Sequence, residues 1–96
     1  MAEYRLSPAA LVDLEAIFDY SVEHWSLEQA VRYTGLIRGT CERLAEAPAA
    51  GRDASAIRPG YRYASAGSHV VYYRIEDEGI AVIRILHSRM DPARHL

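Results

Sequence analysis

The chain lacks the sequence patterns of disulfides, zinc sites and common hydrolytic centres. Its one cysteine, Cys41, cannot form a disulfide within the chain, and no Cys/His spacing typical of a zinc site is present. A Gly-x-Ser-x-Gly elbow, a phosphate-binding loop with lysine and a His-Glu-x-x-His helix are all absent. No apolar run approaches the length of a membrane span, and there is no signal-peptide pattern. We therefore expect a cytoplasmic protein that needs no metal or cofactor and does not contact a membrane.

Lysine is missing altogether, so all eleven basic residues are arginine. Residues 1–48 carry four arginines and eight acids, a net charge of −4, whereas residues 49–96 carry seven arginines and five acids, a net charge of +2. Genome composition is one explanation for the choice of arginine. Whatever the cause, each guanidinium can form planar, bidentate contacts with carboxylate or phosphate groups.

Half of the 96 residues are hydrophobic, which is enough for one small domain spanning residues 1–96. The Ser-Pro pair at 7–8 predicts the start of a helix over residues 9–24, with serine as N-cap and proline in the first turn. Ser26 and Gln29 form the pattern of a capping box for a second helix, which Pro48 ends. Because almost nothing joins the two helices, they should form an antiparallel hairpin, with Trp25 packed at its corner.

Helical spacing predicts which side of each helix is buried. On the first helix the predicted stripe is Leu11, Leu14, Phe18 and Val22, and on the second it is Val31, Thr34, Ile37, Cys41 and Leu44.

The remaining segments have the composition of strands and turns. Residues 3–6 and 60–65 are predicted to be short strands, and residues 48–59 a surface connection. Residues 68–87 hold two runs rich in Val, Ile and Tyr around an acidic turn, the signature of a β-hairpin in which Gly79 supplies a positive φ. The order is β-α-α-β-β-β, an α+β domain with the helical hairpin packed on one face of a mainly antiparallel sheet. The position of the first strand in the sheet is left open.

Strict alternation along the hairpin divides its side chains between two faces. The face predicted to lie under the helices contains Val71, Tyr73, Ile75, Ala81, Ile83 and Ile85. The opposite face is predicted to contain Arg62, Val70, Tyr72, Arg74, Val82, Arg84 and Leu86. Arginines between apolar side chains suit an amphipathic, acidic peptide, so we interpret this set as a binding face. The alternative is that the arginines only form salt bridges, for example with Glu76, on an exposed sheet surface.

Residues for RNA cleavage are scarce. A general base, an acid and phosphate-binding cations would have to come from Glu46, Arg62, Arg84 and His87. Alternation places His87 on the helix-covered side, which favours a structural role for this histidine.

The order and spacing of several short motifs resemble a known family over nearly the whole chain. The motifs are Arg58-Pro-Gly-Tyr-Arg62, Gly67-Ser-His-Val-Val-Tyr-Tyr-Arg74, Ile83-Arg-Ile-Leu-His-Ser-Arg-Met-Asp91 and Ala93-Arg-His-Leu96. In these motifs the chain is similar to ParE toxins of the RelE/ParE toxin–antitoxin superfamily.

The resemblance implies a toxin held inactive by a ParD-like antitoxin in a hetero-oligomer. The antitoxin would bind DNA through its own N-terminal domain, so no direct DNA binding is expected of this chain. The resemblance also implies that the toxin poisons DNA gyrase rather than acting as a catalyst, with the set Arg62, Val70, Tyr72, Arg74, Val82, Arg84 and Leu86 binding the antitoxin. Arg58, Arg89 and Arg94 are possible contacts to the target.

Two alternatives stay open. Ribosome-dependent mRNA cleavage, as in RelE- and YoeB-like members, would use Glu46, Arg62 and His87, although Ser88 follows His87 where YoeB-like nucleases have tyrosine. The other alternative is a degenerate toxin that has kept only its antitoxin interaction.

Overall fold

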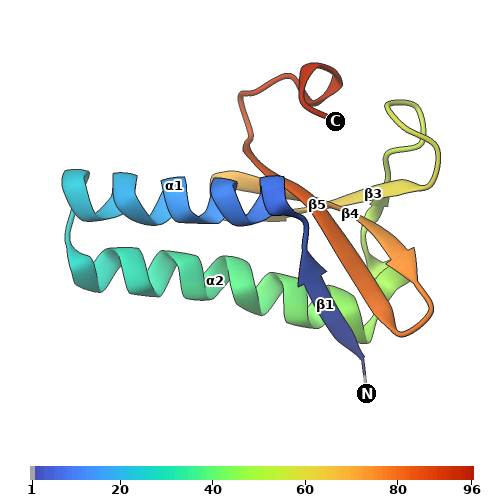
Figure 1. Cartoon of the computed structure of the whole chain (residues 1–96), viewed down its shortest axis with the longest axis horizontal. Coiled ribbons are helices and arrows are strands. Elements are labelled where there is room, and N and C mark those ends of the chain that lie inside the picture. The colour runs from blue at the N-terminus through green and yellow to red at the C-terminus, as the bar shows by residue number, and fades with distance from the viewer. Residues whose placement is uncertain (1) are drawn as a thin grey trace.

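A computed structural model describes residues 2–96 as two helices packed on one face of a five-stranded sheet (Figure 1). The elements follow in this order: β1 (Glu3–Leu6), α1 (Pro8–His24), α2 (Leu27–Glu46), the 3-10 turn η1 (Pro48–Ala50), β2 (Arg52–Asp53), β3 (Tyr61–Ala66), β4 (His69–Glu76), β5 (Gly79–His87) and the 3-10 turn η2 (Pro92–Arg94). The predicted α+β fold is confirmed. The additions are η1 and the two-residue strand β2, within the segment that we expected to be irregular, and η2 near the C-terminus.

The sheet has the order β1-β5-β4-β3-β2. Strand β1 lies at one edge and runs parallel to β5, from the Glu3–Gly79 pair to the Leu6–Val82 pair, while all other neighbours are antiparallel. Gly79 has a φ of 155°, and a Cβ at this position would overlap the carbonyl oxygen of Glu3. Only glycine therefore fits where β1 meets the start of β5.

Both helices begin where the caps predicted them. The Ser7 hydroxyl accepts a hydrogen bond from the Ala10 N–H (3.0 Å) and donates one to the carbonyl of Ile83 (2.6 Å), so the cap also joins α1 to the sheet. The Ser26 hydroxyl accepts from the N–H of Gln29 at the start of α2.

The buried side of α1 differs from the predicted stripe. Ala10, Leu14 and Ser21 are buried, whereas Leu11 and Val22 are exposed and Phe18 is only partly covered. The buried side of the helix therefore carries the small residues Ala10 and Ser21, and small side chains allow a close approach of neighbouring elements. On α2 the prediction holds for four of its five residues, because Val31 alone is exposed.

The core lies between the helices and the sheet, and Tyr73 is fully buried at its centre. Its hydroxyl donates to the carbonyl of Pro48 (2.6 Å) and accepts from the Gly51 N–H (3.0 Å), which fixes the segment between α2 and β2. Within residues 2–96, no helix is long and apolar enough to cross a membrane.

Candidate functional site

The predicted division of the hairpin between two faces fails at one residue of β5. Tyr72 pairs with Arg84 and Tyr73 pairs with Val82, so Ile83 is an additional residue opposite β4. Such a β-bulge shifts the alternation by one position. Ile80, Val82 and Ile85 therefore contribute to the core.

The bulge corrects several predicted positions. Val82 is fully buried under the helices rather than on the opposite face, and Ala81 and Ile83 do not belong to the helix-covered stripe. The assignments of Ile85 and His87 to the helix side hold, because both follow the additional residue.

Arg62 also lies on the helix side, since it is paired with Tyr73. Its guanidinium donates to the carbonyls of Ala49 (3.1 Å) and Gly51 (2.6 Å), and Nε is buried without a partner in the described part of the chain. Arg62 therefore holds the segment before β2 and is not part of an open arginine face. The prediction of alternation from residue 60 onward placed it wrongly.

Arg84 is engaged with α1 rather than free. Its Nε and Nη2 donate to the two carboxylate oxygens of Asp13, both at 2.8 Å, and the backbone N–H of Ile85 donates to the same carboxylate at 2.9 Å. The pair raises the pKa of the Arg84 guanidinium above its ordinary value, chiefly through the hydrogen bond to Asp13. Strand β1 ends at Leu6, so the backbone of β5 beyond the bulge has no neighbouring strand on that side. The Asp13 carboxylate accepts the Ile85 N–H there in place of a strand.

The outer face of the sheet is not bare. Tyr72 and Leu86 point away from the helices and yet are only 7% and 2% exposed. The C-terminal segment 88–96 crosses this face: Arg84 Nη1 donates to the carbonyl of His95 (3.2 Å), and Arg58 donates to the main-chain oxygen of Leu96 (2.8 and 3.1 Å). Burial raises the pKa of the Tyr72 hydroxyl, and the nearby Tyr63 and Asp91 raise it further. A partner could reach Tyr72 and Leu86 only if this segment moved.

One predicted arginine remains exposed on the outer face. Arg74 lies 3.7 Å from the carboxylate of Glu76, which is held more closely by Arg5 at 2.6 Å. These arginines lower the pKa of Glu76, with the hydrogen bond from Arg5 as the largest cause. The predicted pairing with Glu76 is thus confirmed for Arg74.

The possible target contacts lie in or beside the C-terminal segment. Arg58 is occupied by the oxygen of Leu96, Arg94 lies 3.9 Å from Asp91, and the backbone N–H of Arg89 donates to Nδ1 of His87. The side chains of Arg89 and Arg94 are exposed.

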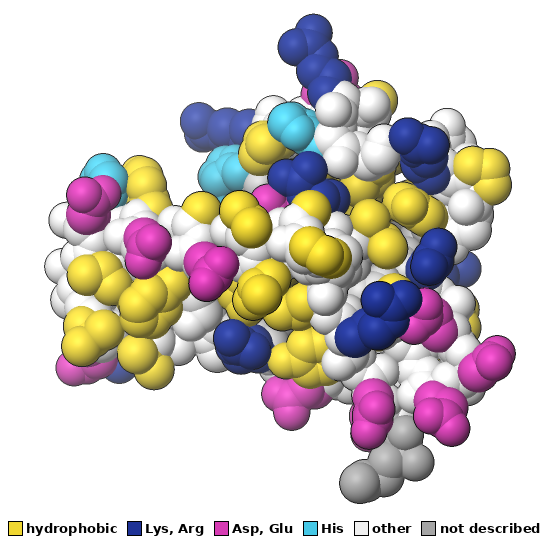
Figure 2. All heavy atoms as spheres, viewed as in Figure 1, with side chains coloured by type: hydrophobic (Ala, Val, Ile, Leu, Met, Phe, Trp, Pro, Cys, Tyr) yellow, Lys and Arg dark blue, Asp and Glu magenta, His cyan; other side chains and the backbone are white. Residues whose placement is uncertain are grey.

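Apolar side chains are exposed mainly on the helices. Figure 2 shows them along the two helices, with acidic side chains beside them on α1. The exposed apolar residues between Pro8 and Glu46 are Leu11, Val12, Tyr20, Val22, Trp25, Leu27, Val31 and Leu36. We call this set the helical apolar surface.

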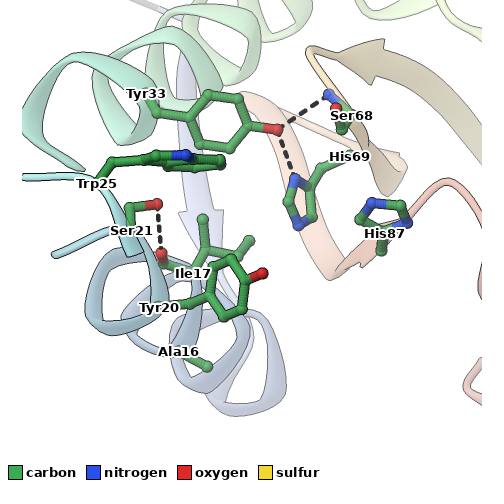
Figure 3. A pocket seen from close by; sticks show the side chains of 9 residues that line it. All are labelled: Ala16, Ile17, Tyr20, Ser21, Trp25, Tyr33, Ser68, His69 and His87. Carbon is green, nitrogen blue, oxygen red and sulfur yellow. Dashed lines mark hydrogen bonds between the residues drawn. The ribbon is translucent and has the colours of Figure 1, made fainter. Parts of the chain in front are cut away.

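A pocket of about 510 Å³ lies at the closed end of the helical hairpin (Figure 3). Trp25, which we expected to be packed in the corner, is 65% exposed and forms one wall. His69 and His87 form the sheet side, with ring centroids 5.2 Å apart. The complete lining is Ala16, Ile17, Tyr20, Ser21, Trp25, Tyr33, Ser68, His69 and His87.

Comparison with known proteins identifies the family. The family model of the ParE toxin of the type II toxin–antitoxin system parDE matches residues 4–92. The chain belongs to the ParE toxin family.

Whole-chain relatives agree with this assignment. A Toxin ParE1 of Mycobacterium tuberculosis is 46% identical over 96 residues, covering 99% of this chain and 98% of the relative. A Toxin ParE1 of Caulobacter vibrioides is 42% identical, covering 100% and 99%. A solved structure described as the chromosomal ParDE TA system from P. aeruginosa superposes with a TM-score of 0.77 at 22% identity, over 91% of this chain and 96% of that one, which supports the fold.

In this ParE-family chain, the residues proposed for RNA cleavage do not converge. Glu46 is the last residue of α2. Its neighbours Ala45 and Pro48 line a hollow together with Gly79, so Glu46 lies near the start of β5. His87 is the last residue of β5, about 26 Å farther along at the usual rise per residue. Arg62 is occupied by backbone carbonyls between these two ends. The geometry provides no shared site for these three side chains.

Sequence reasoning missed the pocket of this ParE-family toxin. Its two histidines come from different strands, and Tyr33 reaches them from α2. The sequence signal for it was that His69 begins the first strand of the predicted hairpin and His87 ends the second. In an antiparallel hairpin these two positions lie side by side.

Proposed function

We propose that this chain is the toxin of a type II toxin–antitoxin pair, neutralised by a ParD-like antitoxin, and that it stops growth by poisoning DNA gyrase. The observation that carries the proposal is the family match over residues 4–92. The relatives named Toxin ParE1, which align along their whole length, support it as well. Binding is favoured over catalysis because Glu46, Arg62 and His87 lie apart.

For the antitoxin contact we propose the helical apolar surface. Exposed apolar side chains that cluster on a small protein often mark an interaction site. Leu27 and Val31 are 62% and 57% exposed and lie one turn apart on α2, so one apolar segment of a partner can cover both. Helix α1 has four acids and no arginine, which favours basic side chains on the part of the partner that lies against it.

On the sheet we keep a smaller part of the predicted antitoxin face. Arg74 is its exposed arginine, and Val70, which lies on the same side of β4 beyond Tyr72, is partly exposed. Arg62, Val82 and Arg84 are taken up by internal contacts. We therefore propose Arg74 as a secondary polar contact that contributes less than the helical apolar surface, because exposed ion pairs contribute little.

Controlled expression in bacteria tests the proposal. Induction of the chain alone should arrest growth, and co-expression of a ParD-like protein encoded beside it should restore growth. Val31→Glu should remain toxic but no longer be neutralised, whereas Arg32→Glu, the matched exposed control on the same helix, should still be neutralised. Growth that continues on induction of a folded chain would overturn the toxin assignment. Normal neutralisation of Val31→Glu would overturn only the surface assignment.

A further inference from the structure

The pocket at the end of the helical hairpin presents two histidines whose Nδ1 atoms both contact neighbouring groups. The Tyr33 hydroxyl accepts the N–H of Ser68 at 3.0 Å, so its own proton is available for Nδ1 of His69, 2.6 Å away. At His87 the backbone N–H of Arg89 donates to Nδ1 at 3.1 Å. With Nδ1 as the acceptor in both rings, each neutral imidazole carries its proton on Nε2.

These Nε2 protons are free to bind a ligand. Within residues 2–96, neither Nε2 atom takes part in a hydrogen bond to the protein, and both side chains line the pocket. The two rings meet at an interplanar angle of 79° with centroids 5.2 Å apart, so an acceptor group with two oxygens can approach both donors. Figure 3 shows the imidazoles beside each other, facing a space bounded by Tyr20 and Trp25.

The other walls are apolar and aromatic. Ile17 and Ala16 come from α1, and the rings of Tyr20 and Trp25 meet edge to face at 6.1 Å. A volume of about 510 Å³ lies in the range of small-molecule sites, which are typically apolar with a few convergent polar groups.

We propose that this pocket binds a carboxylate carried on an aromatic or branched aliphatic group, with the carboxylate at His69 and His87 and the apolar group against Tyr20 and Trp25. The ligand is a free organic acid or the end of a peptide chain, since both offer the same chemistry. This site shares Tyr20 and Trp25 with the helical apolar surface, but its test uses neither gyrase nor the antitoxin.

The surrounding charges agree with an anionic ligand. From α1 the pocket is approached by Asp13, whose carboxylate is already neutralised by Arg84, and by the uncharged Tyr20. Tyr33 on α2 is a neutral donor, and the backbone N–H of Arg89 beyond β5 contacts His87. A bound carboxylate favours the protonated imidazole of His69, so affinity should rise as the pH is lowered from 8 to 6.

The chain provides its own reporter, because Trp25 is its one tryptophan and it lines the pocket. Titration with 4-methylpentanoate, which does not absorb light at the wavelengths that excite tryptophan, should give a saturable change in Trp25 fluorescence. The matched uncharged probe, 4-methylpentanamide, should bind about tenfold more weakly, because it lacks the charge that strengthens the hydrogen bonds. A short peptide ending in leucine, with a free or an amidated terminus, tests the other source of the same group.

Variants assign the effect to the two rings. His69→Gln and His87→Gln should each weaken carboxylate binding about tenfold, while His95→Gln, whose exposed side chain lies outside the pocket lining, should leave it unchanged. Amide ¹⁵N–¹H spectra confirm that each variant is folded and should show ligand-induced shifts at Ser68 and His69 in the unsubstituted chain. Selective binding of either the free acid or the free-terminus peptide supports the site and identifies its source. Equal binding of acid and amide, or no saturable binding by a folded chain, would overturn it.

Discussion

Asp13 and Arg84 join the second turn of α1 to the bulged part of β5 through two parallel hydrogen bonds of 2.8 Å. The same carboxylate also accepts the backbone N–H of Ile85, which β1 is too short to reach. One side chain thus completes the sheet edge, orients the arginine and holds the helix in place. With exposures of 22% and 13%, the side chains of Arg84 and Asp13 are well shielded from solvent.

Replacing Asp13 by asparagine should therefore destabilise the fold. The amide keeps the shape of the side chain but loses the charge and one acceptor, leaving Arg84 partly unpaired. We expect a loss of about 1.5–3 kcal/mol in the free energy of unfolding. Urea denaturation of Asp13→Asn and of the exposed control Asp19→Asn measures this, and the control should change by less than about 0.5 kcal/mol. Equal stabilities for the two variants would show that the pair contributes nothing.

Gly51 should not tolerate a side chain, because a Cβ there would overlap the Tyr73 hydroxyl oxygen. Gly51→Ala must displace the hydroxyl that bonds to the carbonyl of Pro48, so we expect a loss of about 2–4 kcal/mol. Gly35→Ala on α2 is the matched control, since a Cβ on Gly35 would have no other atom within 4 Å. That substitution should stabilise the helix by about 0.5–1 kcal/mol. Thermal melts that rank the two variants in the opposite order would contradict the assigned packing.

His69 should make the fold less stable in mild acid. Burial lowers the pKa of its imidazole, and the nearby His87 lowers it further, partly offset by Asp13. The unfolded chain then binds more protons below the ordinary pKa of about 6.5. Stability is thus greatest above that pH, falls as the pH drops through it, and levels off below the pKa of the folded state. Denaturation of His69→Gln between pH 5 and 8 should show a smaller fall than His24→Gln; identical profiles would refute this.

Cys41 should be inert in the folded protein. Burial raises the pKa of its thiol to about 11, and the side chain is 1% exposed. Because only the thiolate reacts, alkylation by iodoacetamide at pH 8 should be slow in buffer and rapid in denaturant. Mass spectrometry over time gives both rates, and comparable rates would show that the thiol is accessible.

Local patterns predicted the elements of this fold well. Ser7 and Ser26 cap their helices through short-range chemistry, and each occupies its predicted place. Which face of each strand is buried was harder to predict, because the bulge at Ile83 depends on how β5 packs against α1 and β1. No spacing within residues 68–87 indicates that an additional residue will be accommodated there.

The candidate sites depended even more on contacts between distant segments. Strand alternation alone predicted an open outer face, and yet Arg58 and Arg84 hold the C-terminal segment across the sheet by its main-chain oxygens. Such contacts do not depend on the identity of the residue that accepts them. The pocket at His69 and His87 likewise needs the positions of α1, α2 and the hairpin together.

The proposed gyrase poisoning is tested most directly by adding the purified chain to purified gyrase. With plasmid DNA and ATP, we predict that the amount of linear plasmid, which reports trapped cleavage complexes, rises with the concentration of the chain. An equimolar ParD-like antitoxin should prevent this rise. In parallel, mRNA in translating ribosomes should remain intact. Unaffected gyrase together with cut mRNA would contradict the proposal and restore the nuclease alternative.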